Sequence, residues 1–254
     1  PFQGIVSETF IDSKRRSFSR SLLQICKLTY SLLRLMCKGH PRNQMKLFKY
    51  VRVIQSQLGT EMNPENTLLD LFKDNRKLLL KVTSNQIQKF SELISERKLP
   101  RHVLFLTTVC TCHGEAVPSN QNQVVAQLTH AEKTVPVLLA FSVEWDHRSQ
   151  AQTLLLWEKE RPYRKVNITH ISTDDVELEV PKSYEGNLFL YHTRCVELLA
   201  VLCAGRNRMC ADLIMTYRLA PSYADLLDIL SIAGVPMQLK RAYAQLLHFL
   251  YVDR

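Results

Sequence analysis

The apolar residues of this chain recur mostly three or four positions apart, in short segments separated by single glycines or prolines. The first such segment, residues 17–38, predicts an amphipathic helix. We expect a serine between 17 and 21 to cap it, and Gly39 in the left-handed conformation to end it before Pro41. Its predicted apolar stripe is Leu22, Leu23, Ile25, Cys26, Tyr30, Leu33, Met36 and Cys37.

The same periodicity predicts helices along most of the remaining chain. Helix starts are marked by proline in the first turn, as at Pro64 and Pro118, or by a capping side chain, as at Thr83, Ser84 or Ser222. The predicted helices span residues 43–58, 76–82, 101–112, 184–203, 211–219 and 223–232, and further helices are predicted to begin at Pro64, at Thr83 or Ser84, at Pro118 and at Pro236.

The middle of the chain has a different pattern. Residues 135–143, 153–157 and 162–171 are rich in β-branched and aromatic residues and predict short strands, with an exposed turn over 144–152. Paired helices around a small β segment are typical of an α-solenoid with an insertion. We therefore predict a mostly α, armadillo-like α-solenoid, with helical segments at 1–130 and 172–254 and a β-containing insertion at 131–171.

Composition supports a packed helical protein. Of 254 residues, 46% are hydrophobic and 22% charged, so a sizeable core can form and wholesale disorder is not expected. The seven glycines weigh against Gly-rich β folds, and no apolar run approaches the ~18 residues that a membrane span needs. Because the chain begins at Pro1 without Met or a signal-peptide pattern, we expect a segment of a longer protein.

Positive charge is concentrated at the start of the chain. The first 50 residues hold ten Lys or Arg and only Glu8 and Asp12, which gives +8 of the net +9. This predicts an anionic partner, which could be nucleic acid, a phosphate-rich small molecule or an acidic protein surface, although a solvated helical face fits equally. A single-strand site would interleave free aromatics with these cations. Tyr30 and Phe48 fall on apolar stripes instead, so nucleic acid is not expected.

No residue pattern predicts catalysis or a cofactor. The chain has no nucleotide-binding glycine motif, no nucleophile elbow and no zinc-protease helix. His192 and Cys195 lie three apart on a helical face and could form a Cys–His pair, but Cys195 sits in an apolar stripe, where a core role is expected rather than a reactive thiolate. The acidic cluster Asp174, Asp175, Glu177 and Glu179 is expected to be a solvated face. We predict that the protein is not an enzyme.

The seven cysteines favour free, buried thiols. Their number is odd and most lie in apolar helical patterns, which fits a reducing compartment better than a disulfide framework. Cys110, Cys112 and His113 are close in sequence, but no second Cys/His pair follows at zinc-finger spacing. We expect core thiols at a helix end near Cys112, a turn at His113 and Gly114, and no metal site.

Five segments in order resemble the inositol trisphosphate receptor and ryanodine receptor superfamily, in its helical RIH (armadillo-type) region. They are Gly39-His40-Pro41-Arg42-Asn43-Gln44, Asp74-Asn75-Arg76-Lys77-Leu78-Leu79, the stretch from Cys110 to Gln121 (CTCHGEAVPSNQ), Leu154-Leu155-Leu156-Trp157 and Phe249-Leu250-Tyr251-Val252-Asp253-Arg254. The resemblance covers nearly the whole chain, and the segment from Leu22 to Gly59 favours the inositol trisphosphate receptor branch.

The resemblance implies a ligand site near the start of the chain. In the family, a Tyr-Arg-Lys triplet before Asn-Gln helps to clamp phosphates, a task that suits the planar fork of Arg. The matching positions here are His40, Pro41 and Arg42, so Arg42 keeps a cation and Pro41 replaces one. Arg42 and His40 are therefore the candidate ligand-binding residues, although Arg42 fits a surface cation at a helix start equally well.

Two functions remain open. The resemblance implies a cytosolic solenoid segment of a ligand-gated calcium-release channel at the endoplasmic reticulum membrane, with other domains and subunits of the channel, and inositol trisphosphate, as partners. It would carry ligand-driven motion towards the pore. The alternative is an armadillo-like adaptor that binds acidic peptides or nucleic acid through its basic N-terminal helices.

Overall fold

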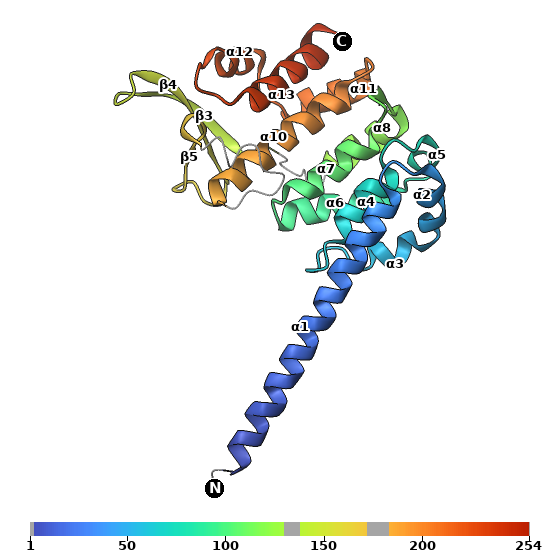
Figure 1. Cartoon of the computed structure of the whole chain (residues 1–254). Coiled ribbons are helices and arrows are strands. Elements are labelled where there is room, and N and C mark those ends of the chain that lie inside the picture. Colours follow the sequence, from blue (N-terminus) through green and yellow to red (C-terminus); the bar gives the residue numbers. More distant parts are fainter. Residues whose placement is uncertain (1–2, 130–137, 172–182, 254) are drawn as a thin grey trace. The chain divides into compact units, whose positions relative to one another are not determined.

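The structure, a computed structural model, describes residues 3–129, 138–171 and 183–253 (Figure 1). The chain divides into two compact units, residues 1–75 and 76–254, which are described separately below. The described residues are mostly helical with a small antiparallel sheet, which confirms the mostly α class with a β insertion in the middle. The armadillo-like stacking and the three-part domain division stay predictions.

The first unit is built around one long helix. It comprises α1 (Gln3–Cys37), α2 (Pro41–Leu47), the 3-10 turn η1 (Phe48–Tyr50), α3 (Val51–Gln55) and α4 (Pro64–Phe72). The C-terminal half of α1 packs against α4 and α2, and its N-terminal half runs on past them (Figure 1). Leu68, Leu71 and Phe72 of α4 are fully buried and form the centre of this small core.

Two predicted boundaries in the first unit are wrong. Helix α1 begins at Gln3 rather than near Ser17, since residues 5–16 hold neither proline nor a further glycine to stop it. The predicted helix 43–58 begins earlier, at Pro41, whose missing N–H is not needed in a first turn. It is also broken into α2, η1 and α3, because Tyr50 leaves the helical conformation (φ −104°, ψ 9°).

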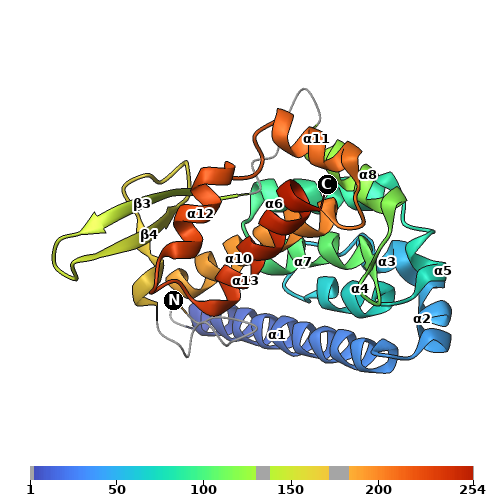
Figure 2. The ribbon, with the colours of Figure 1, turned by 90° about the horizontal axis from the view of Figure 1, so that it is seen from above.

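The second unit packs around the long helix α10 (Tyr184–Cys203), whose side chains are mostly buried. Helices α7 (Pro100–Val109) and α13 (Met237–Leu247) lie against it, and Figure 2 shows α13 beside α10. The remaining described helical elements are α5 (Arg76–Leu79), α6 (Ser84–Glu96), α8 (Pro118–Leu128), η2 (Ile168–His170), α11 (Arg208–Thr216), α12 (Tyr223–Ser231) and the π-helical turn η3 (His248–Val252).

Several predicted helix starts in this unit are confirmed by side-chain caps. Thr83 and Gln86 form a reciprocal capping box at α6, and Ser222 and Asp225 form another at α12. Pro118 opens α8, as its position predicts. At the end of α10, Gly205 adopts the left-handed conformation (φ +73°) that stops the helix.

The predicted helix over 101–112 ends three residues early. Helix α7 stops at Val109, and β1 (Thr111–Cys112) pairs antiparallel with β2 (Glu115–Ala116). His113 and Gly114 both lie in the left-handed region (φ +51° and +82°), which closes this two-residue hairpin. The predicted turn at His113 and Gly114 is thus confirmed, while Cys112 belongs to a strand and not to a helix.

The small sheet is antiparallel, in the order β3–β4–β5. Strand β3 (Ala140–Asp146) pairs with β4 (Ala151–Trp157), and β4 pairs with β5 (Val166–Asn167). The hairpin β3–β4 extends outward from the helices of its unit (Figure 2). The strands reach into the predicted turn 144–152, which shrinks to residues 147–150, and the predicted strand 162–171 shortens to β5 followed by η2. Residues 135–137 and the acidic cluster 174–179 lie outside the described residues.

Candidate functional site

The corner between α1 and α2 carries both candidate ligand residues. Gly39 turns the chain in the left-handed conformation (φ +69°), as predicted, and Asn43 Nδ2 donates to the Met36 carbonyl at 2.8 Å. This bond satisfies one of the carbonyls that a helix end leaves without a partner. His40 and Arg42 are exposed beside this turn, and the His40 side chain makes no capping hydrogen bond.

The buried side chain of Gln44 joins this corner to the end of α4. Its Nε2 donates to the carbonyls of Asp70 (2.8 Å) and Lys73 (3.1 Å), and its Oε1 accepts from Asn75 Nδ2 at 2.8 Å. We call such a contact an amide joint: a buried Asn or Gln bonded to main-chain carbonyls at the end of another helix. Gln44 and Asn75 belong to two different sequence motifs, so the fold brings these motifs together at one joint.

Further polar contacts hold α1 in place. Arg34 Nε donates to Asp70 Oδ2 at 2.7 Å, and the Asp70 side chain is almost buried. Thr67 Oγ1 donates to the Tyr30 carbonyl at 3.0 Å, and the Tyr30 hydroxyl donates to Gln57 Oε1. Burial raises the pKa of the Tyr30 hydroxyl, so it stays a donor at neutral pH. These contacts fix the position of α1 on its unit. The exposed side chains of the corner, such as His40 and Arg42, are accessible to a ligand.

An exposed row of cations lies on this corner. Arg42, Lys46 and Lys49 follow one another four and three residues apart, a spacing that keeps them on one face of α2 and η1. With Lys38 at the end of α1 they form what we call the cationic ridge. Within the described ranges, no carboxylate pairs with any of these four side chains. From Ser13 to Thr60 the sequence contains no Asp or Glu, so the ridge has no local counter-charge.

The sequence interpretation singled out Arg42 and His40 but not Lys46 or Lys49. The spacing of Arg42, Lys46 and Lys49, four and three residues apart, is the sequence signal that would place Lys46 and Lys49 beside Arg42 on one helix face. The two predicted residues, Arg42 in the ridge and His40 beside it, are exposed and accessible to a phosphate. No contact in the structure tests whether they bind one, so this role stays a prediction.

The second unit contains two more amide joints, both in the stretch from Cys110 to Gln121. Asn120 Nδ2 donates to the carbonyls of Leu79 (2.9 Å) and Val109 (2.8 Å), the last residues of α5 and α7. Gln121 Nε2 donates to the carbonyls of Val201 (2.7 Å) and Ala204 (3.1 Å), at the end of α10. Both amides are buried, so these two side chains join helices inside the core.

Side chains also bond one another near the end of α10. Asn207 Nδ2 donates to Gln121 Oε1 at 2.9 Å and to Asn122 Oδ1 at 2.8 Å, while Asn207 also caps α11. Arg206, in the left-handed conformation (φ +59°), donates to Asp253 Oδ1 at 2.8 Å. Asp253 lies in the last of the five motifs. Four of these motifs thus supply polar contacts at helix ends.

The groups that resemble catalytic chemistry lie in the core. Cys195 of α10 is fully buried, as predicted, and so is His192, whose Nε2 lies 2.6 Å from the Tyr243 hydroxyl. Burial lowers the pKa of His192 to about 3 and raises that of the Cys195 thiol. Cys110 and Cys112 are also buried, free thiols, and burial raises the pKa of Cys110. Among the described residues, no group of His, Cys, Asp and Glu has the geometry to hold a metal ion.

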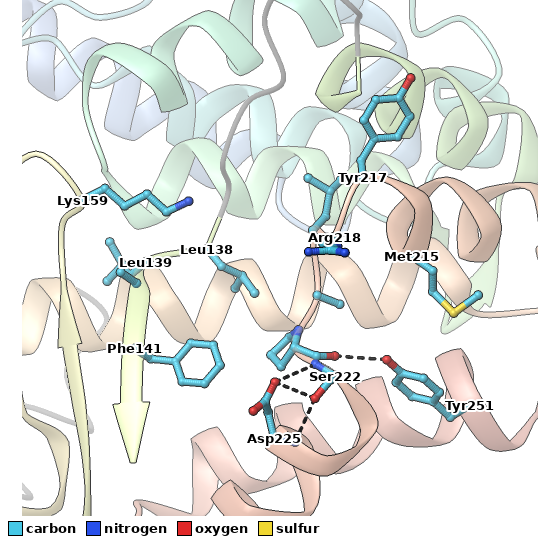
Figure 3. Close-up of a pocket in the computed structure, with 14 residues that line it drawn as sticks. Leu138, Leu139, Phe141, Lys159, Met215, Tyr217, Arg218, Ser222, Asp225 and Tyr251 are labelled. Carbon is cyan, nitrogen blue, oxygen red and sulfur yellow. Dashed lines mark hydrogen bonds between the residues drawn. The ribbon is translucent and has the colours of Figure 1, made fainter. Parts of the chain in front are cut away.

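A pocket of about 890 Å³ opens in the second unit between the start of β3, the loop from α11 to α12 and the end of η3 (Figure 3). Its walls are mixed, with apolar Phe141, Met215 and Tyr251 and the cations Lys159 and Arg218. One wall, at Leu138 and Leu139, directly follows residues that the structure does not describe. We assign this pocket no ligand.

Comparison with known proteins decides the family. Residues 2–135 match the RIH domain of ryanodine and inositol trisphosphate receptors. The chain belongs to this receptor superfamily, in its RIH region. It is 28% identical over 111 residues to the inositol 1,4,5-trisphosphate receptor itr-1 of Caenorhabditis elegans, and 25% identical over 96 residues to the inositol 1,4,5-trisphosphate receptor-like protein A of Dictyostelium discoideum.

These matches are local. They cover 43% and 36% of this chain, and 4% and 3% of the two receptors. The matched RIH range holds the cationic ridge and the joints at Gln44, Asn120 and Gln121, whereas the three-stranded sheet and helices α10–α13 lie beyond it. Within the part of the chain that the structure describes, no helix is both long and apolar enough to cross a membrane.

Proposed function

We propose that this RIH segment is a cytosolic, non-enzymatic part of an intracellular ligand-gated calcium-release channel at the endoplasmic reticulum, where it carries ligand-driven motion towards the pore. Its partners would be other domains and subunits of that channel. Family membership supports the channel setting. The amide joints are the single observation that supports the mechanical role.

The joints suit a mechanical role because of how they connect helices. Helix ends normally expose carbonyls to water, and such ends can shift with little cost. At Gln44, Asn120 and Gln121 these carbonyls instead bond buried amides from another helix. Moving one helix would break these bonds and leave buried polar groups without partners, at about 1–3 kcal/mol each. A displacement of one helix would therefore be passed to the next rather than absorbed between them.

The proposal includes the edge of a polyphosphate site at the cationic ridge. Arg42 would contact one phosphate through its planar guanidinium, with Lys46 and Lys49 adding charge along the same face and His40 beside them. Inositol trisphosphate is the ligand that the names of the two receptors suggest. The ridge is exposed and lacks a local carboxylate, which favours an anion there.

Titration calorimetry with inositol trisphosphate tests this edge. We expect weak binding by the 254-residue chain, decreasing with salt, and a loss of roughly tenfold in affinity in Arg42→Ala. Lys77→Ala is the matched control, since Lys77 is an exposed cation that does not belong to the ridge. Absence of binding, or equal losses in both variants, would remove the ridge from the ligand site.

The mechanical role is tested in the full-length channel that contains this segment. Gln44→Leu should leave ligand affinity nearly unchanged and reduce ligand-driven opening, because the joint acts between the site and the pore. Arg42→Ala should instead lower the affinity for the ligand and leave channel opening at saturating ligand nearly unchanged. If Gln44→Leu left opening intact in a correctly folded channel, the transmission role would be wrong.

A free-standing adaptor for acidic peptides remains the second candidate, favoured by the absence of acidic residues from Ser13 to Thr60. Calorimetry with an acidic peptide and with single-stranded DNA separates it from the channel segment. Strong binding to either, without any response to inositol trisphosphate, would favour the adaptor.

A further inference from the structure

Helix α1 carries large apolar side chains on the side that faces away from its unit. We call these residues the outer stripe, and their exposed fractions lie between 49% and 67%. They are Leu22, Ile25, Leu28, Leu32, Leu35 and Met36. The sequence pattern placed Leu22, Ile25 and Met36 on the buried face, which the structure shows to be wrong.

The outer stripe is separate from the face that packs on the unit. The inner face consists of Leu23, Cys26, Tyr30, Leu33 and Cys37, spaced three and four residues apart. Ile25, Leu28, Leu32 and Leu35 repeat the same three-and-four spacing, about half a helical turn away. A helix that is apolar on two opposite sides normally lies between two neighbours. Among the described residues of this unit, neighbouring helices lie only on the inner side of α1.

Cations line one edge between the two faces. Arg20, Lys27 and Arg34 follow one another at intervals of seven residues, which keeps them on one side of the helix. Arg34 is paired with Asp70, whereas Arg20 and Lys27 have no carboxylate partner among the described residues. The opposite edge carries the uncharged Thr29. A helix lying on anionic lipid would carry cations along both edges of its apolar face.

We propose that the outer stripe docks an acidic amphipathic helix of a partner protein. The apolar side of that helix would cover Ile25, Leu28 and Leu32, and its carboxylates would lie along Arg20 and Lys27. A second copy of α1 fits less well, because its matching edge is either cationic or uncharged and holds no carboxylate between Ser13 and Thr60. The inference does not depend on the proposed channel function.

A designed peptide of about three heptads tests the proposal, with leucine at the a and d positions and glutamate at e and g. Mutual repulsion of the glutamates keeps it from pairing with itself. We expect the 254-residue chain to bind it with micromolar affinity at low salt, and not to bind the same peptide with lysine in place of glutamate. Raising the salt concentration should weaken binding roughly tenfold.

Two variants locate the contact on the outer stripe. The double substitution Leu28→Gln and Leu32→Gln should weaken peptide binding roughly tenfold or more. The matched control is Leu80→Gln, which alters an equally exposed leucine of the second unit. Circular dichroism should give the same helix content for all three proteins, since each altered side chain is exposed.

Three results would overturn the proposal. The first is failure of the glutamate peptide to bind, or equal losses in the double variant and the control. The second is binding to phosphatidylserine vesicles that the double variant loses, which would assign the stripe to a lipid surface. The third is concentration-dependent dimerisation of the chain that the double variant abolishes, which would assign it to a second copy.

Discussion

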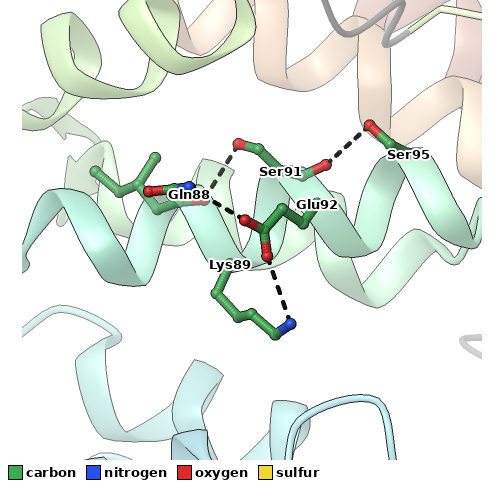
Figure 4. Close-up of polar contacts among 6 residues, drawn as sticks. Gln88, Lys89, Ser91, Glu92 and Ser95 are labelled. Atoms are coloured by element: carbon green, nitrogen blue, oxygen red, sulfur yellow. Dashed lines mark hydrogen bonds and ion pairs between the residues drawn. The ribbon is translucent and has the colours of Figure 1, made fainter. Parts of the chain in front are cut away.

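Helices α1 and α6 differ in what they present on the side away from their cores. On the outer side of α6 the charged side chains are paired with one another: Glu92 accepts a hydrogen bond from Gln88 at 3.1 Å and forms an ion pair with Lys89 at 3.4 Å (Figure 4). The outer side of α1 instead exposes six large apolar residues. Paired charges are typical of a surface that faces water, as on α6, whereas a large exposed apolar patch, as on α1, is typical of a surface that a partner covers.

The inner sides of the same two helices are alike. Ile87, Phe90 and Leu93 of α6 are buried, as Tyr30 and Cys37 of α1 are. Each helix therefore gains its stability from one apolar side. The outer stripe of α1 is extra apolar surface that the fold of its own unit does not require, and this is why we ascribe it to binding.

The largest expected effect comes from the same substitution on the two helices. Leu93→Ala removes a buried side chain from the α6 core and should cost about 2–5 kcal/mol in the free energy of unfolding. Leu32→Ala removes an exposed side chain of α1 and should cost less than about 0.5 kcal/mol. Urea unfolding of the two variants measures the difference. Equal losses would mean that the outer stripe is packed and the comparison fails.

An amide joint should be nearly as costly to break as the core. Gln121→Leu leaves the carbonyls of Val201 and Ala204 buried without their amide, and we expect a loss of about 3 kcal/mol. Gln123→Leu, two residues along α8, removes only one bond to an exposed serine and should cost less than about 1 kcal/mol. If the two losses in denaturant unfolding were similar, Gln121 would not be a structural joint.

The buried His192 should make the second unit sensitive to acid. Its pKa is about 3 in the fold, because burial excludes the charged form, and 6.5 without that burial. Between these values only the unfolded chain takes up the proton, so stability falls as the pH falls below about 6.5. From pH 7 to pH 5 this costs about 2 kcal/mol.

Urea unfolding of the native chain and of His192→Gln at both pH values isolates this effect. The variant keeps a side chain that can bond Tyr243 but cannot titrate, so its loss between pH 7 and pH 5 should be smaller by about 2 kcal/mol. An identical pH dependence in the two proteins would show that His192 titrates normally.

The smallest effect is expected on the solvated side of α6. Lys89→Ala removes an exposed pair with Glu92, a contact worth about 0.3–0.5 kcal/mol on a helix surface. Thermal unfolding should therefore differ little from that of the native chain. A loss well above this range would mean that the outer side of α6 is itself a contact surface.

The sequence predicts local features of this fold well. Thr83, Ser222 and Pro118 mark helix starts by chemistry that involves only three or four neighbouring residues. The core role of Cys195 follows in the same way from the apolar stripe around it. Such signals need no knowledge of distant parts of the chain.

Features that depend on tertiary neighbours could not be predicted. The apolar residues of 17–38 cover so much of the helix circumference that one broad stripe and two opposite faces give the same pattern, and only packing separates Leu22 from Leu23. The partners of Gln44 lie 26 to 31 residues away, so its bonds follow from how α2 meets α4. The candidate ligand residues Arg42 and His40 follow from the resemblance alone, which says nothing of the neighbouring Lys46 and Lys49.

The central claim is that the motif residues form joints between helices, and a double-mutant cycle on Gln44 and Asn75 tests it most directly. The measurement is the unfolding free energy of Gln44→Leu, Asn75→Leu and the double variant. We predict a coupling energy of about 1 kcal/mol or more, because the two side chains share a buried hydrogen bond of 2.8 Å. Strictly additive losses would contradict the account, since the two motifs would then stabilise the fold independently.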